Sequence, residues 1–163
     1  MLLPELQILT SKPVEPATVT AWLSTRYPSA RVHVGDEQPA DTKWTIWLRV
    51  DPSGHRDWPC AIVLAFTQES AIVGPYPEYE LATQLGRLGL DCLVPPRDLV
   101  KGLPKSGGWS LALLEASWFL VDFRGDEAGP RGFFPASGAP RPVVLDTTHL
   151  GAKSIDFKAA VKN

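Results

Sequence analysis

The chain has 163 residues, of which 44% are hydrophobic and 21% are charged, and its formal net charge is −2. This length and composition predict one globular domain over residues 1–163 and exclude a disordered chain. The slight negative charge gives no general attraction to phosphate backbones, so we expect no nucleic acid partner. The sequence has neither a signal-peptide pattern nor an apolar run of about 20 residues, which predicts a cytoplasmic protein that does not contact a membrane.

The first 28 residues predict a strand followed by a helix. The short strand is expected around Leu6–Leu9. Pro16 opens the helix and Pro28 ends it, because proline interrupts a helix interior. The apolar residues of this helix fall at i, i+3, i+4 and i+8, which places them on one stripe. The stripe consists of Val19, Trp22, Leu23 and Tyr27.

Three strands are expected next, over Arg31–Val34, Lys43–Val50 and Cys60–Phe66. In the second strand, alternation places Trp44 on one face with aliphatic residues. Trp47 then lies on the other face, with a threonine and an arginine. The third strand has no polar residue on either face, which is typical of a central strand that is covered on both sides.

The segment VDPSGHRDWP, residues 50–59, gathers a serine, a histidine and two aspartates between the two best strands. Proline, serine and glycine are turn formers, so one interpretation is a polar hairpin loop with a flexible tip. The other is a binding or catalytic role for Ser53, His55 and Asp57. A catalytic triad needs a nucleophile on a rigid element, an oriented base and an oxyanion hole, which a flexible tip does not supply. We therefore predict a loop and assign no catalytic residue.

A second helix is expected over about Pro77–Leu88, with leucines at i, i+4 and i+7 on its apolar face. Proline fits its first turn. Gly89 fits the C′ position just after the helix, and Leu90 supplies the hydrophobic contact of a Schellman ending. A strand is expected to follow over Asp91–Val94.

The remaining segments are less regular. Trp109–Ala116 is so apolar that periodicity does not separate helix from strand, whereas Ser117–Phe123 favours a strand. Arg124–Pro142 is rich in glycine and proline and predicts a long loop. Short strands are expected at Ala71–Val73 and Val143–Leu145. Strands in a row, a helix and then further strands indicate the α+β class, with a mostly antiparallel sheet and two main helices packed on it.

The sequence predicts no cofactor and no metal site. The two cysteines, Cys60 and Cys92, lie in apolar strands, so we expect buried, reduced thiols. The three histidines form no HxH or HExxH pair, and a zinc site therefore has no local signature. The glycines form neither a GxGxxG fingerprint nor a phosphate-binding P-loop, which argues against a nucleotide site.

Eight residues are predicted to bind a partner. Tyrosines and carboxylates interleave in segment 76–80, two tryptophans lie off the expected core faces, and two phenylalanines lie near the middle of the long loop. Tyrosine is enriched in interfaces, and carboxylates pair with a basic partner. The structural alternative is helix-dipole matching for the carboxylates and core packing for the aromatic rings. The eight residues are Trp47, Trp58, Tyr76, Glu78, Tyr79, Glu80, Phe133 and Phe134.

These features favour a protein-binding module. Its sharpest form is an inhibitor or immunity protein that neutralises a bacterial toxin or enzyme, with a basic partner. The alternative is a small enzyme or ligand-binding protein, with a pocket between the sheet and loop 129–142 that Trp47, His55 and Asp57 line. A third hypothesis is a structural subunit that assembles through an exposed strand edge. The lack of a catalytic motif favours the binding module over the enzyme.

Overall fold

The computed structural model describes a two-layer α+β body and short parts of the C-terminal region. The described residues are 3–41, 43–55, 58–67, 77–96, 100–102, 109–122, 141–142 and 155–156. The predicted strands at Ala71–Val73 and Val143–Leu145, and residues 124–140 of the predicted long loop, lie outside these ranges.

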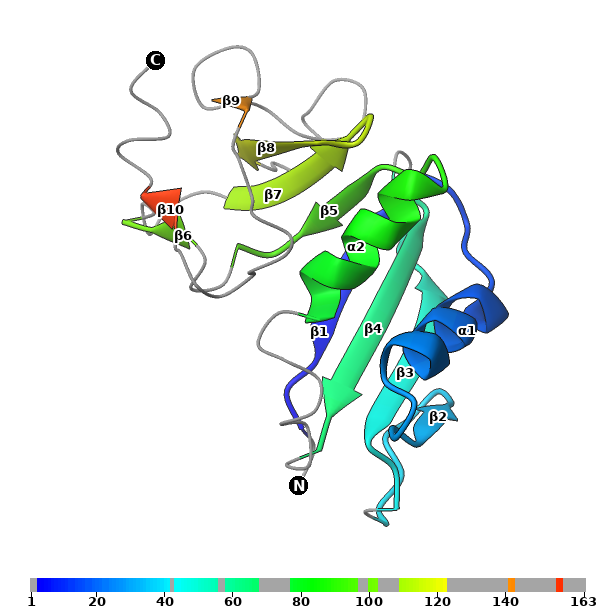
Figure 1. Cartoon of the computed structure of the whole chain (residues 1–163). Coiled ribbons are helices and arrows are strands. Elements are labelled where there is room, and N and C mark those ends of the chain that lie inside the picture. Colours follow the sequence, from blue (N-terminus) through cyan, green and yellow to red (C-terminus); the bar gives the residue numbers. More distant parts are fainter. Residues whose placement is uncertain are drawn as a thin grey trace.

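Within the described residues, eight strands form one sheet in the order β2-β3-β4-β1-β5-β7-β8-β9, and β6 pairs separately with β10 (Figure 1). The strands are β1 (Leu6–Thr10), β2 (Val32–Val34), β3 (Ile46–Pro52), β4 (Cys60–Phe66), β5 (Cys92–Val94), β6 (Val100–Lys101), β7 (Trp109–Leu114), β8 (Ser117–Asp122), β9 (Arg141–Pro142) and β10 (Ile155–Asp156). In the large sheet, β2 runs parallel to β3, and the other neighbours are antiparallel. The predicted mostly antiparallel α+β fold is confirmed.

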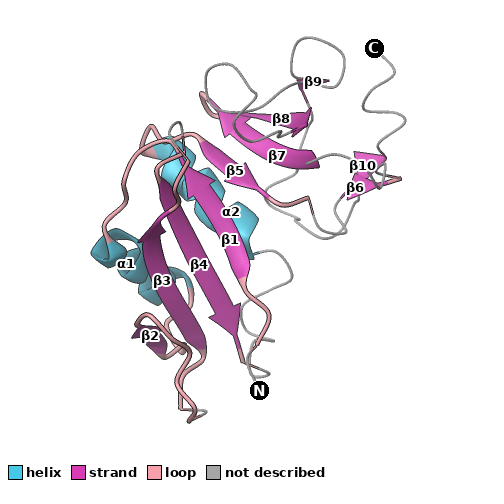
Figure 2. Ribbon diagram, turned by 180° about the vertical axis from the view of Figure 1, so that it is seen from behind, coloured by secondary structure: helices cyan, strands magenta, loops and turns pink. Residues whose placement is uncertain are grey.

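Two described helices, α1 (Pro16–Arg26) and α2 (Pro77–Arg87), cover one face of this sheet. The first packs on β2 and β3, and the second packs on β5, β1 and β7. Figures 1 and 2 show the two helices on the same side of the strands, so the sheet has a helix face and an opposite face. Both helices begin with a proline at their first position, as their sequences predict.

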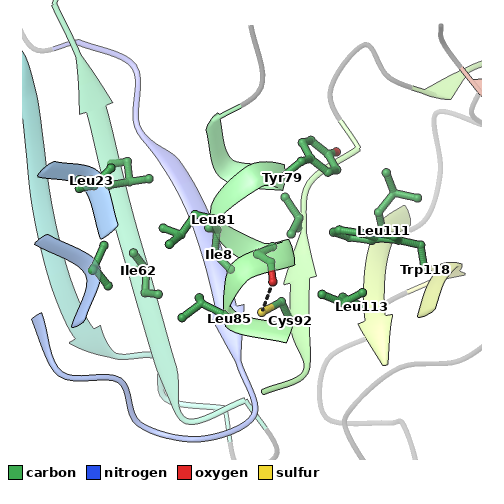
Figure 3. Close-up of a cluster of buried hydrophobic side chains, with 14 of the residues drawn as sticks. Ile8, Leu23, Ile62, Tyr79, Leu81, Leu85, Cys92, Leu111, Leu113 and Trp118 are labelled. Carbon is green, nitrogen blue, oxygen red and sulfur yellow. Dashed lines mark hydrogen bonds between the residues drawn. The ribbon is translucent and has the colours of Figure 1, made fainter. Parts of the chain in front are cut away.

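The main core lies between the helices and the sheet. Leu23 of α1 and Leu81 of α2 pack with the strand residues that alternate onto the helix face, such as Ile8 and Ile62 (Figure 3). Gly86 lets α2 approach β7 closely, because an added Cβ would lie 2.5 Å from the Leu113 side chain. Burial of this apolar surface is the main favourable contribution to folding.

The central strand β4 is covered on both faces, as predicted. It pairs with β1 on one side and with β3 on the other. Ile62 and Leu64 belong to the helix-face core, whereas Val63 and Ala65 pack on the opposite face. Trp44 corrects the expected alternation of β3: it packs with Trp47 on the opposite face, because regular strand geometry begins only at residue 46.

The end of α2 forms the predicted Schellman motif. Gly89 has φ +87°, its N–H donates to the Gly86 carbonyl, and the Leu90 N–H donates to the Leu85 carbonyl. Leu88 was expected on the apolar face, and this prediction is wrong. The helix ends at residue 87 and the chain turns away there, which leaves Leu88 58% exposed.

Strands β7 and β8 form a hairpin, which settles the segment whose periodicity was ambiguous. The strand prediction for 117–123 is confirmed over Ser117–Asp122. The predicted long loop ends early, because Arg141 and Pro142 pair with β8 as strand β9. Local sequence gave no signal for this pairing, because proline and arginine are not strand formers.

The turn of the β7–β8 hairpin has a left-handed backbone at two residues that are not glycine. Glu115 has φ +49° and Ala116 has φ +65°. Two-residue turns of this kind favour Asn-Gly, because a left-handed backbone costs about 1–2 kcal/mol for an ordinary residue. The Asp91 carboxylate supports the turn by accepting a hydrogen bond from the Glu115 N–H (2.9 Å).

Replacing Glu115 and Ala116 by Asn-Gly is expected to raise the free energy of unfolding by about 1–2 kcal/mol. The Glu115→Asn change keeps the backbone N–H that Asp91 accepts, so that hydrogen bond persists. Gly54→Ala is the opposing control, because Gly54 has φ +81° and no atom of the described residues lies within 4 Å of an added Cβ. It should lower stability through the backbone alone. Urea unfolding measures both variants, and a destabilised Asn-Gly variant would refute the expectation.

Candidate functional site

Four of the eight predicted partner-binding residues have no exposed surface. They are Trp47, Trp58, Glu78 and Tyr79. A side chain without exposed surface cannot contact a partner in this conformation, so their expected surface position is wrong. Tyr76, Phe133 and Phe134 lie outside the described residues, and their assignment stays a prediction.

Trp47 is buried because other side chains cover the opposite face of the sheet around it. The Arg49 guanidinium lies 5.1 Å from the centre of its ring, an arrangement typical of a cation–π contact. Asp51 and Glu5 form ion pairs with the same guanidinium, which holds it in place. Together with Trp44, these groups close over the tryptophan.

The side chains in the first turn of α2 contact other parts of the protein, which leaves them unable to form the expected partner surface. The Tyr79 hydroxyl donates a hydrogen bond to the Pro95 carbonyl, and its ring packs on Trp118 with centroids 5.7 Å apart (Figure 3). Glu80 is half-buried and joins the two helices. Its carboxylate accepts hydrogen bonds from the Tyr27 hydroxyl (2.8 Å) and from Arg26 (3.1 Å). Burial and this carboxylate raise the pKa of Tyr27.

Residues 53–59 of the segment VDPSGHRDWP connect β3 and β4, as predicted, but β3 continues through Asp51 and Pro52, which were expected to begin the turn. The described part of the tip is held in place. Ser53 donates from its hydroxyl to the Trp58 carbonyl, and the same oxygen accepts the His55 N–H (3.1 Å). The Ser53 N–H also donates to the Pro59 carbonyl (3.0 Å). Trp58 packs with Leu93 on the opposite face of the sheet. The Ser53 hydroxyl therefore organises the loop, and Asp57 lies outside the described residues.

One hollow that described residues line lies where α2 ends, and we call it the α2-end hollow. Its volume is about 590 Å³. It is lined by Ser11, Lys12, Gly86, Gly89, Leu90, Asp91, Glu115 and Ala116. These residues come from the exit of β1, the end of α2 and the β7–β8 turn, which the strand order β1-β5-β7 brings together.

Asp91 organises the α2-end hollow. Its N–H donates to the Ser11 hydroxyl (3.0 Å), and its carbonyl accepts the Ser11 N–H (3.0 Å). Its carboxylate is bound to the Glu115 N–H, and the residue is only 8% exposed. The residues that line the hollow include two with carboxylates, Asp91 and Glu115, and one with an amine, Lys12, and the hollow lies at the negative end of the α2 dipole, so this balance favours a positive group.

An exposed apolar residue belongs to the same helix end as this hollow. Leu88 is 58% exposed, and in the chain it lies between Gly86 and Gly89, which both line the hollow. A single exposed leucine is normal on a protein surface. An exposed leucine beside a desolvated carboxylate combines the apolar and charged contacts that recur at interface centres.

A smaller hollow of about 240 Å³ opens on the opposite face of the sheet, and we call it the sheet-face hollow. It is lined by Gln7, Leu9, His55, Leu93, Val94, Pro95 and Ser110. Of these, sequence reasoning singled out only His55. The glutamine and the serine gave no signal, because each simply alternates with buried residues along its strand.

The described ranges place no three histidine, cysteine, aspartate or glutamate side chains together in a group suited to a metal ion. Neither described helix has the length and apolarity needed to cross a bilayer. Both cysteines are free and buried, as predicted, and burial raises the pKa of the Cys92 thiol to about 12.

Comparison with known proteins gives no relative for this chain. No protein-family model matches it, and no curated protein and no solved structure matches it either.

Proposed function

We propose that this chain is a protein-binding module that receives a basic side chain of a partner protein in the α2-end hollow. The observation that carries the proposal is the exposed Leu88 at the end of α2, where the acidic residues Asp91 and Glu115 line a hollow. The leucine supplies an apolar anchor, and the carboxylates supply charge complementarity to lysine or arginine.

The position of this interface differs from the sequence-based expectation. Segment 76–80 was expected to contact the partner, but Glu78 and Tyr79 are buried and Glu80 joins the two helices. The other end of the same helix carries the exposed leucine and the open hollow. We therefore propose an acidic interface at the end of α2 in place of the one expected at its start.

The finer form of this proposal is an inhibitor or immunity protein that neutralises a basic bacterial toxin or enzyme. Such a protein needs a stable scaffold and a complementary surface. The two-layer body supplies the scaffold, and the α2-end hollow supplies a surface that favours a basic partner. The free buried thiols of Cys60 and Cys92 fit a reducing compartment such as the cytoplasm.

Charge reversal at Glu115 should weaken partner binding at least tenfold, because a like charge would then face the basic group. Glu115 is exposed, so Glu115→Lys is compatible with the fold. Affinity capture from a lysate of the native host identifies the partner, and calorimetry with the purified partner gives the dissociation constant. An assay of the partner's own activity then tests the inhibitor form.

Leu88→Ser tests the apolar half of the same interface, and Val34→Ser is its matched control. Val34 is also exposed, at 46%, but it lies on the edge strand β2, several strands away from the β1, β5 and β7 ends that border the hollow. We expect Leu88→Ser to weaken binding and Val34→Ser to leave it unchanged. A partner that binds the wild type, Glu115→Lys and Leu88→Ser equally well would place the interface elsewhere.

A further inference from the structure

Strand β2 forms an open edge of the large sheet. It pairs with β3 on one side, and within the described residues the strand order places no strand beyond it (Figures 1 and 2). The Arg31 carbonyl and the Gly35 N–H, which flank β2, are both bonded to β3. Because backbone groups point to alternate sides along a strand, the peptide groups of Val32 and Val34 point away from β3. An edge of this kind is a template for pairing with another strand.

The side chains of β2 leave this edge accessible. Val34 is 46% exposed, although its register partner Leu48 belongs to the main core on the helix face. His33 is exposed on the opposite face. Proteins commonly protect an open edge with a lysine, a proline or a very short strand. The sequence of β2, VHV, has neither a lysine nor a proline, and its length of three residues limits the strength of any pairing.

The charges at the two ends of this edge favour a second copy of the same chain. Arg31 precedes β2, whereas Asp36 and Glu37 follow it, and all three residues are exposed. Antiparallel pairing of two copies brings the basic end of one edge next to the acidic end of the other, and opposite charges on neighbouring strands stabilise the pair. This attraction acts over several ångströms, so it does not require Arg31 to be without partners in its own chain.

We propose that two copies of this chain pair through β2, antiparallel and about a two-fold axis, so that the sheet continues from one copy into the other. Val32 of each copy lies opposite Val34 of the other, because this register lets the outward peptide groups of both residues form hydrogen-bonded pairs. The exposed Val34 side chain thereby gains an apolar neighbour. The two His33 residues face each other at the axis as a non-hydrogen-bonded pair, with Cα atoms about 4.5 Å apart.

The helix layer is compatible with this arrangement. Both copies place their helices on the same side of the joined sheet, because the two-fold axis stands perpendicular to it. Since α1 packs on both β2 and β3, the two α1 helices become neighbours. The charged residue of α1 is Arg26, which Glu80 pairs at 3.1 Å, and its exposed positions include the small residues Ala17 and Ala21. Small, uncharged side chains allow the axes of two helices to approach to about 8–10 Å.

Sedimentation equilibrium of the full chain tests the pairing. The wild type should be monomeric at about 10 µM and approach the mass of a dimer towards about 1 mM, because a short edge makes a small interface and therefore a weak dimer. Val34→Pro should stay monomeric over this range. Proline removes the outward N–H that the second copy needs, whereas an edge strand tolerates proline where its N–H faces solvent. Leu88→Ser is the control and should dimerise like the wild type.

Two substitutions of His33 test the register. His33→Asp sets two carboxylates opposite each other at the axis, so the dimer should weaken at least tenfold, and this variant replaces Val34→Pro if the latter does not fold. His33→Cys places two thiols there, within the Cα separation of about 4.4–6.8 Å that a disulfide requires. Mild oxidation at high protein concentration should therefore give a disulfide-linked dimer. Leu88→Cys, an exposed thiol away from β2, is the matched control, and the wild type with its buried Cys60 and Cys92 gives the background.

Any of three results would overturn the pairing through β2. The first is a wild type that stays monomeric at about 1 mM. The second is a dimer that is equally strong in the wild type and in the folded Val34→Pro or His33→Asp variant. The third is cross-linking of Leu88→Cys as fast as that of His33→Cys. These measurements need no second protein and change no residue that lines the α2-end hollow, so this proposal and the protein-binding proposal fail separately.

Discussion

Replacing Trp58 by alanine is expected to lower the free energy of unfolding by about 3–5 kcal/mol, the range for truncating a buried large aromatic residue. Trp58 has no exposed surface and packs against Leu93, Ala112 and Val121. Its removal leaves a cavity on a face of the sheet that no described helix can fill by moving inward. The variant keeps the backbone carbonyl that accepts the Ser53 hydrogen bond but loses the ring that fixes residue 58 to the sheet, so the loop around His55 should loosen.

Trp22→Ala is the matched control for this prediction. Trp22 is only partly buried at the edge of the main core, where its ring meets Tyr27 edge-on at 5.9 Å. It should cost at least about 1 kcal/mol less than Trp58→Ala, because less apolar surface returns to water. Chemical unfolding measures both variants. A small effect of Trp58→Ala would mean that the ring is a surface residue, as the sequence first suggested.

Trp58 shows why a residue's neighbours along the chain can mislead. The loop signals around it were correct, since residues 53–59 do connect two strands. Sequence position alone could not show that the loop folds back onto the sheet and inserts the ring beside Leu93. That contact depends on β5, which follows in the sequence only after α2. Local patterns predict an element, whereas burial of a loop side chain depends on what lies next to it in space.

The elements with strong local signals were predicted well. Two prolines frame α1, a wholly apolar run marks β4, and Gly89 marks the end of α2. Each signal reflects a backbone requirement or a periodicity that needs no distant partner. Leu88 was misplaced for a related reason. The apolar periodicity of the sequence continues to Leu88, whereas the helix ends one residue earlier.

The two hollows could not be predicted, because each collects residues that are far apart in the sequence. Ser11, Asp91 and Glu115 meet only because β1, β5 and β7 are neighbours in the sheet. No spacing rule links these positions. The sequence therefore predicted partner binding in compact segments such as 76–80, where the side chains of Glu78 and Tyr79 are in fact buried. The acidic lining of the α2-end hollow likewise depends on the strand order, which brings Asp91 and Glu115 together.

The second large effect is expected at alkaline pH and depends on Cys92. Burial, and secondarily the charge of Asp91, raises the pKa of this thiol from 9.0 to about 12. The sulfur lies under α2, 3.9 Å from the Ala82 carbonyl (Figure 3). A rise of this size corresponds to about 4 kcal/mol of preference for the protonated thiol in the folded protein.

The direction of the effect follows from proton binding. Above about pH 9 the thiol of the unfolded chain loses its proton, while the folded protein keeps it until about pH 12. The unfolded state then binds fewer protons, so stability is fully present below about pH 9 and falls as the pH rises towards 12. At about pH 10.5 the expected loss is about 2 kcal/mol.

Urea unfolding of the wild type and of Cys92→Ala between about pH 7 and pH 10.5 tests this expectation. The alanine variant should start less stable at neutral pH, because it loses packing under α2, but its stability should change less as the pH rises. Tyr27, whose pKa is also raised, acts in the same direction only above its usual value of 10.0, and Tyr27→Phe removes that contribution. Equal pH dependence in the wild type and Cys92→Ala, measured in the Tyr27→Phe background, would show that the thiol is not the controlling group.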